Sequence, residues 1–261
     1  MPIEKQLISF YTILRKGVIR IFRIWSQTLL PSIVTSVLYF AIFGSILGSR
    51  IGELNGVPYI LFVVPGLVML AVITSAFMEV ASTFFFAKFF SRNIDEILVS
   101  PTPPVVIIAG FIASGVVRGM LVGLLVLIVS LFFALPSVAH PLIVLLFLFL
   151  SSLTFSLGGL INGIYAKNFD GITIVPTFVL TPLVYLGGVF YSINSLPPFW
   201  QAVSLGNPIF YLINGFRYGF LGTSDVPPRS LGTHARTTWR ELVFPQERPR
   251  HLQLVHKLCG R

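Results

Sequence analysis

The sequence predicts an all-α, polytopic membrane protein with five spans. Composition is the first reason: 55% of the 261 residues are hydrophobic and 10% are charged, whereas a soluble domain carries about 25% charged residues. The second reason is that five apolar stretches reach the roughly 20 residues with which a helix crosses the hydrocarbon core. These stretches are residues 28–48, 59–80, 105–133, 141–165 and 172–190.

The composition also excludes several kinds of site. Because the chain has a single cysteine, Cys259, it forms neither a disulfide framework nor a multi-cysteine metal site, and we expect no metal and no cofactor. A P-loop needs a Gly-Lys pair beside the phosphates, and the sequence contains none, so we expect no ATP site in this chain. The spans offer Glu79, Arg118 and scattered Ser and Asn but no pair of carboxylates, which argues against an intramembrane enzyme and leaves no catalytic residue.

Residues 1–27 are basic and amphipathic. They lack the apolar core and small-residue cleavage site of a signal peptide. One helical face carries the apolar side chains Leu14, Val18, Ile21 and Trp25, and the opposite face carries the cations Lys16, Arg20 and Arg23. We expect a helix in the membrane interface, with its apolar side in lipid and its cations near anionic headgroups. Such a helix serves as an anchor, as a docking surface for a cytoplasmic partner, or as both.

The distribution of Lys and Arg predicts the orientation of the spans. Eight of these residues lie in segments 1–27, 81–104 and 164–171, whereas the opposite loops, 49–58 and 134–140, hold only Arg50. Cytoplasmic loops are enriched in Lys and Arg. We therefore expect the N-terminus and segment 81–104 to lie in the cytoplasm.

Two ionisable residues fall inside the predicted spans, where charge is costly. Glu79 lies near the inner end of the second span, and we expect it to reach interfacial water. The position of Arg118 leaves two interpretations open. In the first, residues 105–117 lie along the interface and Arg118 marks the start of a span over 119–135. In the second, Arg118 faces a buried partner or the substrate path.

The last two spans carry packing signals. Small residues recur on one face of the fourth span, which predicts close helix packing rather than a substrate groove; they are Ser152, Ser156, Gly159 and Gly163. In the fifth span, Pro176 and Pro182 remove backbone donors, so we expect an irregular helix.

An apolar, aromatic segment, residues 195–222, follows the fifth span. Pro197 and Pro198 break one helix, while Asn207 and Pro208 form a good N-cap and first-turn pair. The pattern predicts two short helices that dip into the outer leaflet without crossing it. Its aromatic side chains suit an interfacial belt, with direct contact to substrate as the alternative; they are Trp200, Tyr211 and Tyr218.

Residues 92–100 form a short charged segment between the second and third spans. Ser91 is a suitable N-cap and Pro101 a stop, so the pattern predicts about two and a half helical turns. Because a helix of this length is marginal in water, the membrane surface or another protein must hold it. The residues alone leave a solvated loop as the alternative.

Five stretches between Ile19 and Pro227 resemble the bacterial ABC-2 type transport permeases. They are "RIFRIWSQTLLPSI" (20–33), "FVVPGLVML" (62–70), "RNIDEILVSPTP" (92–103), "VPTFVLTPLVYLGGVFYSINSLPPFWQ" (175–201) and "NPIFYLINGFRYGFLG" (207–222). The resemblance implies the membrane-spanning subunit of an ATP-driven exporter in the bacterial inner membrane. It also implies a homodimer that works with two separate ATPase subunits.

The resemblance further assigns the segment after the second span to a coupling helix, which sits in a cleft of the ATPase subunit. The candidate coupling residues are Arg92, Ile94, Asp95, Glu96, Ile97 and Leu98. The acids would accept hydrogen bonds from basic groups of the ATPase, and the apolar side chains would supply buried area. The short outer helices would lie where substrate leaves. The candidates for the substrate path or gate are Arg118, Trp200, Asn207, Pro208 and Tyr211.

The family pattern breaks after Pro227, where a sixth span is expected. The tail that stands there holds seven Lys and Arg and would emerge on the outer face, against the charge distribution of the other loops. We therefore divide the chain into an interface helix (1–27), a transmembrane domain (28–222) and a divergent basic tail (223–261). Our hypothesis is that the tail is out of frame, through a sequencing error or a frameshift; the alternative is a genuine soluble tail.

The leading interpretation is thus an exporter subunit driven by a separate ATPase. The alternative is an ion-coupled carrier or channel without an ATPase, although proton coupling usually needs a carboxylate or histidine in mid-membrane. We expect membrane lipids as further partners and no nucleic acid. Nothing in the sequence selects a substrate.

Overall fold

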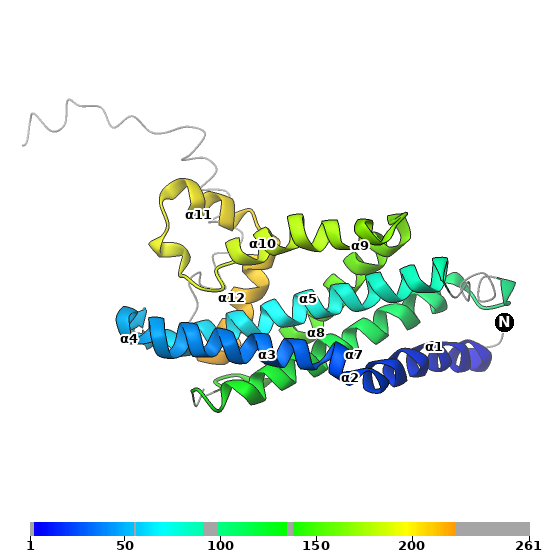
Figure 1. Cartoon of the computed structure of the whole chain (residues 1–261), viewed down its shortest axis with the longest axis horizontal. Coiled ribbons are helices and arrows are strands. Elements are labelled where there is room, and N and C mark those ends of the chain that lie inside the picture. The colour runs from blue at the N-terminus through cyan, green and yellow to red at the C-terminus, as the bar shows by residue number, and fades with distance from the viewer. Residues whose placement is uncertain (1–2, 55, 91–98, 135–137, 223–261) are drawn as a thin grey trace, which may run out of the picture.

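The computed structural model describes residues 3–54, 56–90, 99–134 and 138–222. These residues form helices that pack side by side in an elongated bundle (Figure 1), apart from one short hairpin. Within the described part of the chain, five helical stretches are long and apolar enough to cross a membrane: Trp25–Gly44, Tyr59–Phe89, Pro104–Ser130, Pro141–Tyr165 and Phe169–Leu186. Each overlaps one predicted span, which confirms the all-α membrane fold.

The long helix α5 (Tyr59–Phe89) is the centre of the bundle. It contacts α7 (Pro104–Ser130) and α8 (Pro141–Tyr165) along its length. Its 31 residues correspond to about 46 Å, more than the roughly 30 Å of a hydrocarbon core. Most of its surface is apolar, and its apolar window is 72% buried, as expected of a helix at the centre of a bundle. Completely buried side chains in its middle include Val64, Val68 and Ile73.

Close approach between α8 and α5 depends on the predicted stripe of small residues. A Cβ atom on Gly159 would lie 2.2 Å from the carbonyl oxygen of Phe77, and one on Gly163 would lie 3.0 Å from that of Ala81. Ser152 and Ser156 of the same stripe are completely buried. The prediction that this face serves tight packing is therefore confirmed.

The first span is built from consecutive helical pieces. These are α2 (Trp25–Thr28), α3 (Leu30–Tyr39), a π-helical segment η1 (Phe40–Leu47) and α4 (Gly48–Ile51). A two-stranded antiparallel hairpin, β1 (Glu53–Leu54) and β2 (Val57–Pro58), then leads into α5. We call the end of the bundle that carries this hairpin the hairpin end.

The N-terminal helix α1 (Ile3–Arg23) packs along α7 toward the opposite end, which we call the basic end (Figure 1). Gly17 permits this contact, because a Cβ atom there would lie 2.6 Å from Cβ of Ser114. The predicted lipid-facing stripe is partly wrong. Ile21 is completely buried in the protein core, whereas Trp25 is 56% exposed. A helical wheel shows that a face is apolar, but it does not distinguish lipid from a neighbouring helix.

The fifth span is irregular, as predicted. It consists of α9 (Phe169–Val175), a π-helical segment η2 (Pro176–Leu180) and α10 (Thr181–Leu186). A one-turn 3-10 helix η3 (Ile193–Ser195) and the short helices α11 (Pro198–Leu205) and α12 (Pro208–Leu221) follow at the hairpin end. Asn207 caps α12, since its Oδ1 accepts a hydrogen bond from the Ile209 amide at 3.0 Å. The predicted helix break and cap are thus confirmed.

Two predictions fall outside the described residues. The candidate coupling residues Arg92, Ile94, Asp95, Glu96, Ile97 and Leu98 lie in the interval 91–98, and the basic tail begins at residue 223. The structure places the ends that border the first interval. The C-terminus of α5 and the start of α7 both lie at the basic end (Figure 1).

Candidate functional site

A buried carboxylate at the basic end joins three helices. The side chain of Glu79 on α5 is completely buried, and two arginines reach it from different elements. Arg118 of α7 donates from Nη1 to Oε2 at 2.5 Å, and Arg20 of α1 forms an ion pair with Oε1. Thr83, one turn along α5, accepts a second hydrogen bond from Arg20. We call Arg20, Glu79, Thr83 and Arg118 the ion-pair cluster.

The ion-pair cluster also fixes the start of the first span. Nη2 of Arg118 donates to the carbonyl oxygen of Thr28 at 3.2 Å, so this side chain connects α7 with both α5 and α2. Two cations share one anion, and their side chains are only 33% and 15% exposed. Removing one member of a buried ion pair leaves an uncompensated charge and is strongly destabilising. The cluster therefore holds α1, α2 and α7 on the central helix.

The structure corrects the predicted role of Glu79 and decides between those of Arg118. Glu79 does not reach water at the interface, because it is completely buried. Arg118 faces a buried partner. The alternative in which residues 105–117 lie along the interface is wrong, since α7 is a single helix from Pro104 to Ser130. The partners of Glu79 lie 59 and 39 residues away in sequence, beyond the reach of local patterns.

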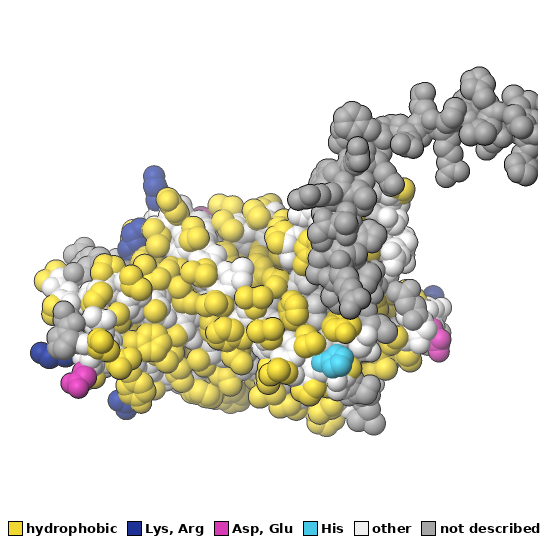
Figure 2. All heavy atoms as spheres, turned by 180° about the vertical axis from the view of Figure 1, so that it is seen from behind, with side chains coloured by type: hydrophobic (Ala, Val, Ile, Leu, Met, Phe, Trp, Pro, Cys, Tyr) yellow, Lys and Arg dark blue, Asp and Glu magenta, His cyan; other side chains and the backbone are white. Residues whose placement is uncertain are grey.

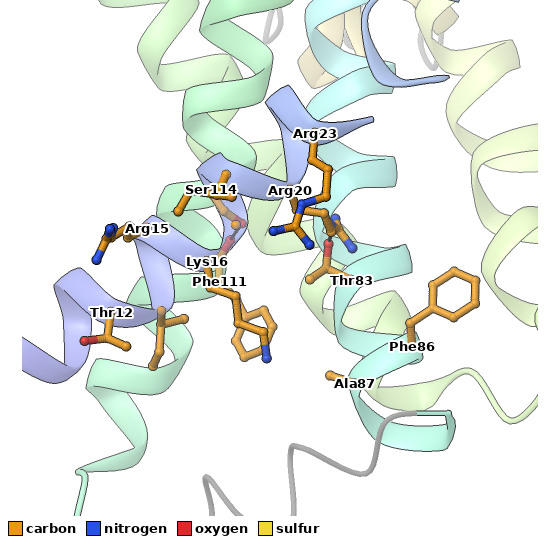
Figure 3. A pocket seen from close by; sticks show the side chains of 13 residues that line it. Thr12, Arg15, Lys16, Arg20, Arg23, Thr83, Phe86, Ala87, Phe111 and Ser114 are labelled. Atoms are coloured by element: carbon orange, nitrogen blue, oxygen red, sulfur yellow. Dashed lines mark hydrogen bonds between the residues drawn. The ribbon is translucent and has the colours of Figure 1, made fainter. Parts of the chain in front are cut away.

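Next to the cluster is a cavity of about 710 Å³ between α1, α5 and α7, which we call the basic pocket (Figure 3). It is lined by Thr12, Ile13, Arg15, Lys16, Gly17, Ile19, Arg20, Arg23, Thr83, Phe86, Ala87, Phe111 and Ser114. All four cations come from α1. Figure 3 shows Lys16, Arg20 and Arg23 extending toward the space between α1 and α5, while Arg15 points to the other side.

The basic pocket combines positive charge with apolar surface. Three hydroxyl-bearing residues and the rings of Phe86 and Phe111 contribute to its lining. Lys16 and Arg23 are exposed, as the sequence predicted for the polar face of this helix. Arg20, predicted to lie near headgroups with them, is instead partly buried and bound to Glu79. The pocket thus combines Arg20, which Glu79 holds in place, with exposed cations such as Lys16 and Arg23.

A second cavity, of about 300 Å³, lies farther along α5 between α3 and α10. We call it the hydroxyl groove, because it is lined by Pro31, Ser32, Thr35, Ser36, Tyr39, Leu67, Leu70, Ala71, Thr74, Thr181 and Tyr185. No charged side chain is among these lining residues. The phenol oxygens of Tyr39 and Tyr185 are 3.3 Å apart, and both rings contact Phe190. The groove offers hydrogen bonds and ring faces without charge.

A third polar contact, at the hairpin end, was missed by the sequence analysis. Arg217 of α12 is 1% exposed. Its Nη2 donates to the carbonyl oxygen of Gly188 at 2.6 Å, and its guanidinium lies 3.9 Å from the ring centre of Phe62, a cation–π contact. The sequence did contain a signal for this contact. Arg217 is an ionisable residue within the apolar run 207–222, and such residues need buried partners.

The predicted substrate-path residues are not brought together. Arg118 belongs to the ion-pair cluster at the basic end, whereas the other four lie around α11 and α12. Nδ2 of Asn207 donates to the Leu183 carbonyl at 2.5 Å, and the Tyr211 phenol donates to that of Leu205 at 2.7 Å. Burial raises the pKa of this phenol.

Pro208 and Trp200 are the other two predicted substrate-path residues at α11 and α12. Pro208 begins α12, and Trp200 is 46% exposed with its ring edge-on to Phe199. The geometry shows that Asn207 and Tyr211 fasten the α11–α12 corner. Contact of any of these residues with substrate stays a prediction.

Comparison with known proteins identifies relatives along most of the chain. A family model described as ABC-2 type transporter matches residues 8–221. The chain is 56% identical over 220 residues to the Inner membrane transport permease YadH of Escherichia coli (strain K12), covering 84% of this chain and 86% of that protein. It is 26% identical over 213 residues to Nodulation protein J of Rhizobium meliloti (strain 1021), covering 76% of this chain and 78% of that protein.

Proposed function

The chain belongs to the ABC-2 type transporter family as the membrane subunit of an inner-membrane transporter, and from this premise we propose that it exports a substrate from the cytoplasm. ATP hydrolysis by a separate ATPase subunit supplies the energy. The sequence supports this division of labour, because it lacks the Gly-Lys pair of a P-loop. The energy must then enter through a contact between subunits.

In this proposal the basic end faces the cytoplasm. Eight Lys and Arg lie in the segments assigned to that side, against one in the loops of the other side. Figure 2 shows the same asymmetry on one face: Lys and Arg side chains gather mainly at the end that carries α1, and hydrophobic side chains cover the flank. With this orientation, α1 lies at the inner surface of the membrane near anionic headgroups.

The contact with the ATPase is residues 92–100, the coupling helix that the family implies. Asp95 and Glu96 offer acceptors to basic groups, while Ile94, Ile97 and Leu98 offer apolar area. The two helices that flank the segment support this role. It is joined to α5 and α7, and the ion-pair cluster links those two helices to α1. A displacement of the segment would therefore be transmitted to α5, α7 and α1 through direct contacts.

The hydroxyl groove is the observation that carries the proposed substrate path. It opens between the first and fifth spans, whose apolar windows are each 22% buried, against 72% for that of α5. Two spans with so much uncovered surface suit contact with a second copy of the chain. We therefore place the path between two permease subunits, with the groove of each as its lining.

Co-purification with the ATPase subunit tests the coupling contact. The double variant Asp95→Lys/Glu96→Lys should lose the association, because like charges then face the basic groups of the ATPase. The matched control, Glu4→Lys/Glu53→Lys, makes the same charge change at two exposed positions outside the segment and should retain it. Unchanged association of the Asp95→Lys/Glu96→Lys variant would contradict the assignment.

Transport in vesicles distinguishes the exporter from an ion-coupled carrier or channel. An exporter moves substrate only when the ATPase and ATP are present, whereas a carrier responds to an ion gradient alone. The structure gives the carrier little support, since Glu79 is already engaged by two arginines. Proton coupling needs a carboxylate that can exchange partners during transport.

We also propose that residues 223–261 are an out-of-frame segment rather than part of the transmembrane domain. The family match supports this boundary, because it ends at residue 221. Resequencing of the coding DNA from independent isolates should show a shifted frame that restores an apolar span. A continuous frame encoding the same basic tail in each isolate would refute the proposal.

A further inference from the structure

The basic pocket is a defined cavity rather than a diffuse charged surface. Its volume of about 710 Å³ lies within the range of roughly 300–1,000 Å³ typical of small-molecule sites. Arg20 is held in place by Glu79 and Thr83 before any ligand arrives. We propose that this pocket binds the phosphate headgroup of one anionic membrane glycerolipid, such as phosphatidylglycerol.

The charge of the pocket selects an anion. Lys16, Arg20 and Arg23 extend toward the pocket (Figure 3). Glu79 pairs with Arg20 among these cations and shares its charge with Arg118 outside the lining, so the pocket stays positive. Guanidinium groups bind phosphate oxygens through paired hydrogen bonds, and basic pockets between membrane helices bind anionic headgroups. The Thr12 and Thr83 hydroxyls in the same lining add neutral hydrogen-bonding groups.

The apolar surface beside the pocket selects a lipid over a free anion. Ile19 and Phe86 belong to the lining and are 43% and 39% exposed. Along α5 from Phe86, the rings of Phe89 and Phe90 are also exposed, and Phe86 contacts the exposed ring of Phe169 on α9. A free phosphate would leave this apolar surface exposed, whereas the acyl chains of a lipid would cover it.

The depth of the pocket agrees with a headgroup. Glu79 lies 20 residues after Tyr59, the first residue of α5, which corresponds to about 30 Å along the helix. This distance equals the thickness of a hydrocarbon core of about 30 Å. If α5 enters the core at Tyr59, the ion-pair cluster lies where the core ends. The phosphates of the inner leaflet lie about 5 Å farther out. Thr83, which lines the pocket, lies four residues or about 6 Å beyond Glu79 on α5, and so reaches that level.

Lipid binding to the purified chain, without an ATPase, tests the proposal. Native mass spectrometry would count dioleoylphosphatidylglycerol molecules retained per chain, with dioleoylphosphatidylcholine as the reference lipid. The Lys16→Gln/Arg23→Gln variant should lose about thirtyfold in affinity for the anionic lipid, since each cation near the surface contributes about 1 kcal/mol. Lys5→Gln/Arg50→Gln removes the same charge from exposed positions outside the pocket and should stay within about twofold of the parent chain.

A second variant tests the cavity without changing charge. Thr12→Trp adds a large side chain at an exposed position of the lining and should displace the bound lipid while leaving the fold intact. Two results would overturn the proposal: equal loss in the pocket variant and its control, which indicates diffuse attraction, or no loss in any variant. Inorganic phosphate that competes as well as the lipid would also overturn it, in favour of a free anion. Because no ATPase is present, a failure here is distinguishable from a failure of the export proposal.

Discussion

The basic pocket and the hydroxyl groove both lie along helix α5, but they differ in the kind of polar group that lines them and in how those groups form hydrogen bonds. The pocket has four cations in its lining, one of which shares the carboxylate of Glu79 with Arg118. The groove has seven hydroxyl-bearing residues and no charge among its lining side chains. The Ser36 and Thr74 hydroxyls donate to carbonyls one turn back in their own helices, at 2.7 and 2.8 Å.

This difference follows from the cost of each group in lipid. A charge needs a partner from another helix, so the charged site joins three helices and stabilises their packing. A hydroxyl satisfies itself within its own helix, so it adds little constraint and is free to accept a new partner. The ion-pair cluster beside the pocket thus joins helices. In our proposals, the pocket binds a lipid headgroup and the groove lines the path of a substrate.

The largest expected effect is that of Glu79→Gln. Arg20 and Arg118 would lose their shared anion, and the free energy of unfolding should fall by about 3–5 kcal/mol. Thermal unfolding of the purified protein in detergent measures this loss. Glu53→Gln, at an exposed position in the hairpin, should leave the apparent Tm unchanged. Adding Arg118→Met to the Glu79→Gln variant should recover part of the loss, because one stranded charge is removed. Equal stability of the Glu79→Gln and Glu53→Gln proteins would show that the ion-pair cluster does not stabilise the packing of α1 and α7 on α5.

Gly159→Ala should have the next largest effect. The added Cβ would meet the Phe77 carbonyl oxygen at 2.2 Å, so α8 must move away from α5, at about 1–3 kcal/mol. The neighbouring Gly158→Ala is a matched control. Its Cβ would lie 3.4 Å from the ring of Phe77, an ordinary contact, and alanine favours a helix by up to about 1 kcal/mol. The same unfolding measurement compares the two. A Gly158→Ala protein less stable than the Gly159→Ala protein would contradict the packing described here.

Tyr39→Phe should have the smallest effect on stability. It removes a single exposed contact between hydroxyls at 3.3 Å, which is worth less than about 1 kcal/mol. Transport in vesicles should nevertheless fall, because the groove loses a hydrogen-bonding group. Tyr165→Phe is the control, since its side chain is 79% exposed and lies outside the groove. Equal transport by the two variants would remove Tyr39 from the proposed path.

The parts of the fold that could be predicted from the sequence depend on local signals. The fourth span was predicted at residues 141–165, and α8 runs from Pro141 to Tyr165, because the length of an apolar run and a proline at its start are enough to define a helix. The cap at Asn207 and the irregular helix at Pro176 are equally local. Span boundaries were less accurate. The second span was predicted to end at residue 80, but α5 continues through the Phe-rich residues 81–89 to Phe89.

The candidate site depends on contacts between distant segments, and there the sequence was a poorer guide. Nothing near Glu79 in the chain indicates that Arg20 and Arg118 will meet it, and the buried position of Arg217 depends on the placement of α12 against α5. The coupling segment stays a prediction of the sequence and the family. The basic pocket emerges only when α1 packs on α7 and its Arg20 reaches Glu79 of α5.

The account depends most on the orientation of the bundle, because the coupling contact and the lipid pocket both require the basic end to face the cytoplasm. After replacement of the single cysteine by Cys259→Ser, one new cysteine can be placed at either end, by Glu53→Cys in the hairpin or by Lys167→Cys between α8 and α9. Both positions are exposed. A membrane-impermeant maleimide applied to spheroplasts should label the Glu53→Cys protein at once and the Lys167→Cys protein only after permeabilisation. The opposite pattern would contradict the account.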